Sequence, residues 1–274
     1  MTEERKSYGV TEREPDADAI GAHAERIRLA GYSVLNTSFT AEEIADIAHR
    51  LDRLYQRQVD EYGADRLDAI GDRFSVRCPL VDDETFLSLA TFPPLLALVR
   101  RLVGDYVVLM QQNGVVNPPS QDHTQAAYHR DLPYQHFVSS RPLAVSALFC
   151  IDPFTEETGA TVVIPASHHV ERFASNDVAS SLEVPVTAAP GSFIVFDAML
   201  FHRAGHNRST RVRRGVNHVF TMPLIAQQIS LPAALGGRYA DRPGVRALLG
   251  YDTEPAPSAA AWRDRRLRRK TQTT

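Results

Sequence analysis

A change of pattern near residue 106 limits how this chain can fold more than any other feature. Before it, apolar residues recur at helical spacing; after it, short runs rich in Val, Ile and Phe are separated by turn residues. Helices followed by many short strands predict a mainly β domain with flanking helices and a jelly-roll core. The expected strands are 106–112, 143–151, 161–164, 192–196 and 215–221.

Helix signals lie mostly in the N-terminal half. Thr40 and Glu43 form a capping box ahead of apolar residues at helical spacing. Elsewhere proline marks the first turn of a helix and glycine marks its end. The expected helices are 18–30, 40–59, 93–104 and 245–249, with a short strand at 32–35 and irregular structure over 63–92.

Length and composition predict one domain. The chain has 274 residues, enough for a single sizeable core, and no repeat or low-complexity linker divides it. We expect a flexible N-terminus over 1–16, one domain over 17–250, and a tail over 251–274 that is Pro/Ala-rich and then basic. The tail either covers the site or helps to form a homodimer, and the sequence does not decide between these.

Charge and cysteine content limit the kinds of binding partner and the cellular compartment that we expect. A formal net charge of −3 argues against a dedicated nucleic-acid surface. No apolar run approaches the roughly 18 residues of a membrane span, and the polar N-terminus lacks the apolar core of a signal peptide. With only Cys78 and Cys150 there is no disulfide framework, so a cytoplasmic protein is expected.

A candidate metal site begins with His129 and Asp131, which lie two residues apart. On a strand both side chains point to one face and can reach one ion. His202, at the end of an apolar strand, is the best third ligand. Two histidines and a carboxylate leave neighbouring positions open, as in non-haem Fe(II) oxygenases. The spacing of His129 and Asp131 is by itself weak evidence for a metal site, because His169 and Glu171 have the same spacing.

An arginine on the next expected strand strengthens this interpretation. Arg213 follows His202 by 11 residues, and its planar fork suits a carboxylate such as the far end of 2-oxoglutarate. Strand alternation places Arg211 on the same face and Arg214 on the opposite one.

Four segments, 128–132, 157–168, 190–197 and 202–217, resemble in this order the phytanoyl-CoA dioxygenase family of Fe(II)- and 2-oxoglutarate-dependent oxygenases, over roughly residues 31–222. The resemblance implies a cupin-like double-stranded β-helix in which His129, Asp131 and His202 hold the catalytic iron and Arg213 binds 2-oxoglutarate. It also implies that O2 is consumed and that succinate and CO2 are released. Ala204 stands where some relatives carry a hydroxyl residue that touches the cosubstrate.

Asp131 bears on which reaction the enzyme would catalyse, because halogenating relatives have a small residue at that position. Its presence favours hydroxylation, or another oxidation such as desaturation, cyclisation or epoxidation, of a small-molecule substrate, which we expect to belong to specialised metabolism. Further cosubstrate or substrate contacts are expected from Thr161 and from Gln111 or Gln112, of which one amide should point inward. Substrate contacts are expected from residues 132–138 and from Arg73 and Arg77. The alternatives are a cupin-like metalloenzyme that does not use 2-oxoglutarate and a catalytically silent binding protein on the same scaffold.

Overall fold

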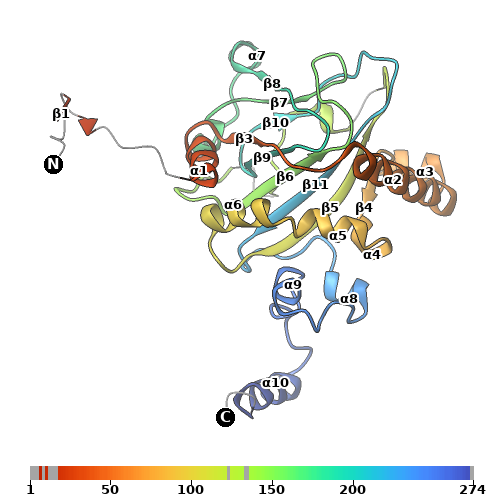
Figure 1. Cartoon of the computed structure of the whole chain (residues 1–274), viewed down its shortest axis with the longest axis vertical. Helices are drawn as coiled ribbons and strands as arrows, with labels where there is room; N and C mark the ends of the chain where they lie inside the picture. The colour runs from red at the N-terminus through yellow and green to blue at the C-terminus, as the bar shows by residue number, and fades with distance from the viewer. Residues whose placement is uncertain (1–5, 8–9, 12–17, 122–123, 133–135, 272–274) are drawn as a thin grey trace.

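Two antiparallel sheets form the centre of the molecule (Figure 1). The computed structural model describes residues 6–7, 10–11, 18–121, 124–132 and 136–271. The larger sheet has six strands in the order β3-β9-β6-β11-β5-β4, and the smaller has the order β10-β7-β8. The strands are β1 (Lys6–Ser7), β2 (Val10–Thr11), β3 (Tyr32–Leu35), β4 (Ser75–Arg77), β5 (Val108–Asn117), β6 (Ala144–Cys150), β7 (Thr161–Val163), β8 (Val184–Val186), β9 (Phe193–Asp197), β10 (His202–Arg203) and β11 (Arg213–Thr221).

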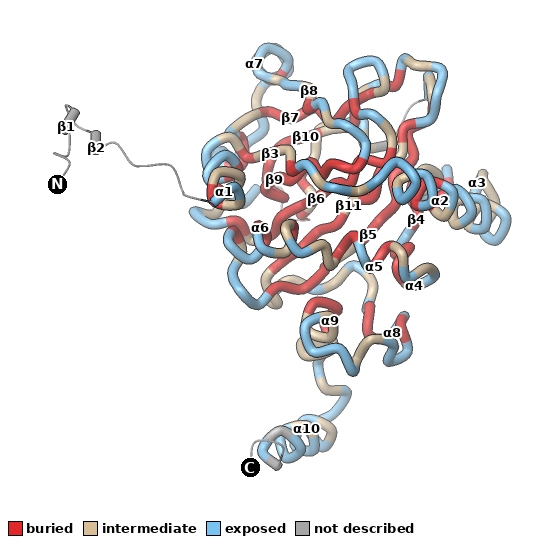
Figure 2. Tube along the Cα trace, viewed as in Figure 1, coloured by how far each residue is buried: buried red, intermediate tan, exposed pale blue. Residues whose placement is uncertain are grey.

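Alternate residues of the larger sheet build two separate cores. On β6, Val145, Ala147 and Phe149 face the helices, while Leu148 and Cys150 pack with residues of the smaller sheet. This alternation is what a strand buried on both faces requires. Figure 2 shows the buried residues concentrated along these strands. The space between the sheets is therefore the interior of the predicted jelly roll.

Helices cover the outer face of the larger sheet, as predicted. The capping box at the start of α2 is present, since Thr40 N donates to Glu43 Oε2 at 2.7 Å and Glu43 N donates to Thr40 Oγ1 at 3.2 Å. The helices are α1 (Ala19–Ala30), α2 (Ala41–Tyr62), α3 (Ala64–Ala69), α4 (Pro79–Asp82), α5 (Thr85–Ala90), α6 (Pro93–Val103), α7 (Asn176–Leu182), α8 (Leu231–Leu235), α9 (Pro243–Leu248) and α10 (Ala259–Thr271), with 3-10 turns η1 (Thr124–Ala126) and η2 (Ser167–His169).

Residues 63–92 depart from the prediction. They were expected to be irregular, but they contain α3, β4, α4 and α5. These elements are three to six residues long, too short to show a clear period in the sequence. Leu67, Leu80, Phe86 and Leu89 are buried, so tertiary packing and not local propensity stabilises them.

The C-terminal helix stands apart from the sheets. In Figure 1, α10 lies beyond α8 and α9, at the far end of the molecule from β7 and β8. Trp262 and Leu267 on this helix are largely exposed. None of the helices in the described part of the chain is both long enough and apolar enough to span a membrane.

Gly159 permits a close approach of two loops beside the smaller sheet. Its φ is +77°, and a Cβ added there would lie 2.5 Å from Gly205 O. We expect Gly159→Ala to lower the free energy of unfolding by about 2–4 kcal/mol, from the left-handed backbone and the steric clash together. Thermal or urea unfolding of the purified variant measures this.

Gly236→Ala is the matched control, because Gly236 has left-handed backbone angles, with φ +57° and ψ +34°, and a Cβ added there would meet no described atom within 4 Å. That variant should lose only about 1–2 kcal/mol, the backbone cost alone. Equal losses in the two variants would mean that the contact with Gly205 is not tight.

Candidate active site

The three predicted metal ligands meet at one point between the sheets. His129 forms an isolated bridge with His202: its N–H donates to His202 O at 2.9 Å, and His202 N–H donates back at 3.1 Å. Asp131 N–H donates to Ala198 O at 2.9 Å. Among the described residues, these three are the only group of His, Cys, Asp or Glu that could hold a metal, so His169 belongs to no rival site.

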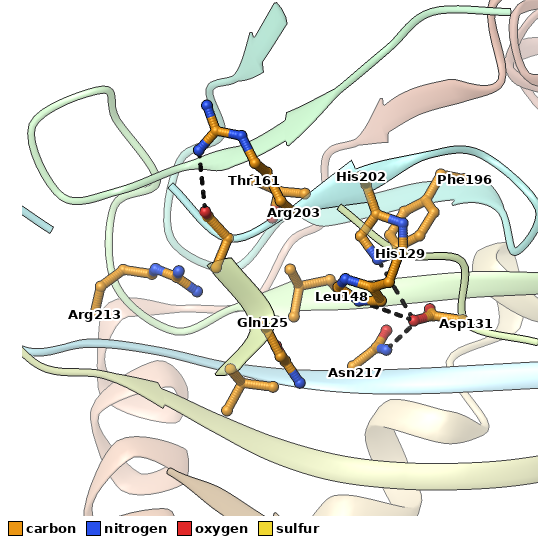
Figure 3. Close-up of a pocket in the computed structure, with 12 residues that line it drawn as sticks. Gln125, His129, Asp131, Leu148, Thr161, Phe196, His202, Arg203, Arg213 and Asn217 are labelled. Carbon is orange, nitrogen blue, oxygen red and sulfur yellow. Dashed lines mark hydrogen bonds and ion pairs between the residues drawn. The ribbon is translucent and has the colours of Figure 1, made fainter. Parts of the chain in front are cut away.

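The ligand atoms are placed as one ion requires. Asp131 Oδ1 lies 3.4 Å from His202 Nε2 and 3.8 Å from His129 Nε2, and all three donor atoms lie within 4.8 Å of one another (Figure 3). In each histidine Nδ1 lies 2.9 Å from a backbone oxygen, that of Ala127 for His129 and that of Leu200 for His202. A proton on Nδ1 would leave the Nε2 lone pair free for a metal. The residues therefore fit Fe(II) well.

Burial and mutual charge set the ionisation of the three ligands. Burial lowers the pKa of His129, and the neighbouring His202 lowers it further. For His202, burial also acts to lower the pKa, but the charge of Asp131 outweighs it and the pKa is raised. Burial would raise the pKa of Asp131, yet the two histidines and Ser146 hold it well below its usual value. Asp131 is therefore a carboxylate, the form that binds a cation.

Arg213 forms another wall of the same cavity. It is 2% exposed, its guanidinium lies 4.3 Å from the ring of Phe154, and Nη2 donates to Gly159 O at 2.9 Å. Burial lowers its pKa to about 10, so it stays charged at neutral pH. Its Nε has no partner among the described residues. A buried cation without a carboxylate partner provides a fixed site for an anion.

The other residues that were expected to contact the cosubstrate or substrate lie on different strand faces. Thr161 is buried in the wall of the cavity, as expected. Gln112 points the other way: Nε2 donates to Phe86 O at 2.7 Å and Oε1 accepts from Leu80 N at 3.0 Å, so its amide fastens the helices to the sheet. Gln111 is half-buried on the opposite face of β5 but does not line the cavity.

The two arginines that were expected to contact the substrate form ion pairs with carboxylates of the protein. Arg73 pairs with Asp68, with Nη1 2.6 Å from Oδ2, and Arg77 pairs with Asp72. Neither is thus a free receptor for an anionic substrate. Of the segment 132–138, residues 133–135 lie outside the described part of the chain.

Several cavity residues had no role in the sequence interpretation. Asn217 follows Arg213 by four positions on β11, so strand alternation could have placed it on the same face. The others depend on contacts between distant segments. Together with the predicted residues and with Arg203 and Ala204, the cavity is lined by Val115, Gln125, Leu148, Phe196 and Asn217.

Comparison with known proteins adds to this geometry. The family described as Phytanoyl-CoA dioxygenase (PhyH) matches residues 27–215. The uncharacterized protein Rv1501 of Mycobacterium tuberculosis is 33% identical over 217 residues, which cover 77% of this chain and 79% of that protein. Dioxygenase trt7 of Aspergillus terreus is 42% identical over 74 residues, 27% of this chain and 26% of that protein.

Solved structures share the fold. EctD from S. alaskensis, crystallised with 2-oxoglutarate and 5-hydroxyectoine, has a TM-score of 0.63 and 23% identity, over 77% of this chain and 79% of that one. The α-ketoglutarate-dependent epimerase SnoN has a TM-score of 0.56 and 22% identity, over 76% of this chain and 84% of that one. The predicted double-stranded β-helix with flanking helices is confirmed, although helices hold about 39% of the described residues and strands about 20%.

The family match and the dioxygenases among the relatives confirm the predicted enzyme class, a 2-oxoglutarate-dependent non-haem iron dioxygenase. Its cofactor is Fe(II), and its cosubstrates are 2-oxoglutarate and O2. The chain belongs to the phytanoyl-CoA dioxygenase family.

Proposed function

We propose that this dioxygenase hydroxylates a small-molecule substrate, with His129, Asp131 and His202 as the iron ligands and Arg213 as the anchor of 2-oxoglutarate. The observation that carries the proposal is the presence, in the wall of one cavity, of three mutually close ligand atoms and a buried arginine. A metal ligand set alone would also suit a cupin-like enzyme without 2-oxoglutarate. The buried cation is the feature that favours a dicarboxylate cosubstrate.

Each side chain has a distinct task. The two imidazoles and the Asp131 carboxylate would hold Fe(II) on one face and leave neighbouring positions open. Bound Fe(II) supplies the activation of O2, in which 2-oxoglutarate is converted to succinate and CO2 and one oxygen atom goes to the substrate. Arg213 would bind the far carboxylate, and the hydroxyl of Thr161 in the same wall offers it a further hydrogen bond.

The presence of Asp131 supports hydroxylation over halogenation. A carboxylate at this position occupies the coordination site that a halide would need. We place the substrate class among small molecules of specialised metabolism. Arg73 and Arg77 do not line the cavity, so they lend no support to an anionic substrate.

The proposed catalytic unit is the single domain 17–250, and the family match lies within it. We further propose a cytoplasmic location, which suits two cysteines, Cys78 and Cys150, that are both unpaired and buried. None of the described residues of the tail 251–274 lines the cavity.

Anaerobic titration tests the proposed function. Apo-protein loaded with Fe(II) and then with 2-oxoglutarate should develop the weak visible metal-to-ligand charge-transfer band of the chelated cosubstrate. His202→Ala should abolish the band because it removes a ligand. His206→Ala should retain it, because His206 is exposed and lies outside the ligand group. Metal binding without a band would favour the cupin-like enzyme, and absence of metal binding would favour a silent scaffold.

A further inference from the structure

Ser146 and Asn217 both lie against the side of Asp131 that faces away from the histidines. Ser146 Oγ donates to Asp131 Oδ2 at 2.5 Å, and Asn217 Nδ2 approaches the same oxygen at 3.4 Å (Figure 3 draws the Asn217 contact). The other oxygen, Oδ1, is the one near His129 and His202. The two oxygens of the carboxylate thus have separate surroundings.

The two polar residues come from rigid neighbouring strands. Ser146 lies on β6 opposite Val219, and Asn217 lies on β11 opposite Leu148, so they are diagonal neighbours on the inner face. Ser146 is fully buried and does not line the cavity, whereas Asn217 does. The amide oxygen of Asn217 is buried without a partner among the described residues, and Figure 3 shows it turned toward the space between His129 and Leu148.

The backbone alone does not fix how the carboxylate is turned. The Asp131 N–H is held by Ala198 O, but the torsion that rotates a carboxylate is broad in energy. A carboxylate can bind a cation through one oxygen or through both. Binding through both would close a position that the cosubstrate needs. Hydrogen bonds to Oδ2 prevent that rotation.

We propose that Ser146 and Asn217 are positioning residues that hold Asp131 as a one-oxygen metal ligand and so keep the neighbouring coordination positions open. The proposal rests on the proposed function for its purpose, but its test uses metal binding alone. Both residues would hold the Oδ2 atom of Asp131, Ser146 from outside the cavity lining and Asn217 from within it.

Anaerobic Fe(II) titration of Ser146→Ala tests this without a substrate. Loss of a hydrogen-bond partner of a metal ligand typically weakens metal affinity about 10- to 100-fold, and we expect a loss in that range. At saturating Fe(II), 2-oxoglutarate should also bind more weakly and give a shifted charge-transfer band. Ser33→Ala is the control, since Ser33 is a buried strand serine that bonds His23, 2.8 Å away, outside the cavity.

Asn217→Leu is the second variant and decides the matter should Ser146→Ala fail to fold. It lacks the amide donor and should also lose Fe(II) affinity. Wild-type Fe(II) affinity in both variants, with only a lower melting temperature of the metal-free protein, would overturn the proposal. Failure of the proposed function has a different signature: the wild type would bind Fe(II) without a charge-transfer band, while the two variants still lost metal affinity.

Discussion

An Asp131→Ala variant is expected to lose Fe(II) binding and, with it, all substrate-coupled turnover. Asp131 is the only carboxylate in the ligand group that the described residues form, and its Oδ1 lies within 4 Å of both Nε2 atoms. Without this carboxylate, Fe(II) would keep only two neutral protein ligands and would lose the anionic one that offsets its charge. We expect affinity to fall by more than about 100-fold, beyond the loss that removal of a supporting residue causes.

Calorimetric Fe(II) titration under argon and succinate release with 2-oxoglutarate measure the two effects. Asp83→Ala is the matched control, because Asp83 is an ion-paired carboxylate that contacts Arg50 and does not line the cavity. It should leave metal affinity and turnover unchanged. Full turnover in Asp131→Ala would remove this residue from the active site.

Local periodicity was enough to place His129 with Asp131 and to separate Arg213 from Arg214. His129 and Asp131 share a direction because they lie two positions apart, even though their segment forms an isolated bridge and not a regular strand. The same alternation separates Arg213, which is buried in the cavity wall, from Arg214, which pairs with Asp152. These inferences needed only the chain's own period of two.

Periodicity failed where contacts between distant segments decide the outcome. Gln112 lies on the face of β5 toward the helices because Leu80 and Phe86, some 30 positions earlier, supply partners for its amide. The contacts of Ser146 and Asn217 with Asp131 depend on the register between β6 and β11. The alternating pattern of each strand shows which residues share a face, but it does not show which residues of two strands far apart in the sequence stand opposite each other. The residues that orient the metal ligand were therefore not predicted.

Replacing Arg213 should separate cosubstrate binding from metal binding. Arg213→Ala removes the buried cation but leaves the three ligands untouched. Truncating one partner of a buried charge pair costs about 2–5 kcal/mol, so the KM for 2-oxoglutarate should rise roughly 30- to 3,000-fold. Fe(II) affinity should be unchanged, and the charge-transfer band should return at high 2-oxoglutarate concentration.

Two further variants show whether 2-oxoglutarate binding depends on the position of the arginine or only on its charge. Arg214→Ala keeps every cavity residue and loses only the ion pairs with Asp152 and Asp52, so its KM should equal that of the wild type. Arg213→Lys retains a cation but not the planar fork, and its KM should lie between those of the wild type and Arg213→Ala. An unchanged KM in Arg213→Ala would transfer the role to another cation. An intermediate KM in Arg213→Lys would mean that the cavity recognises the shape of a carboxylate as well as its charge, which is what distinguishes a 2-oxoglutarate site from a general anion site.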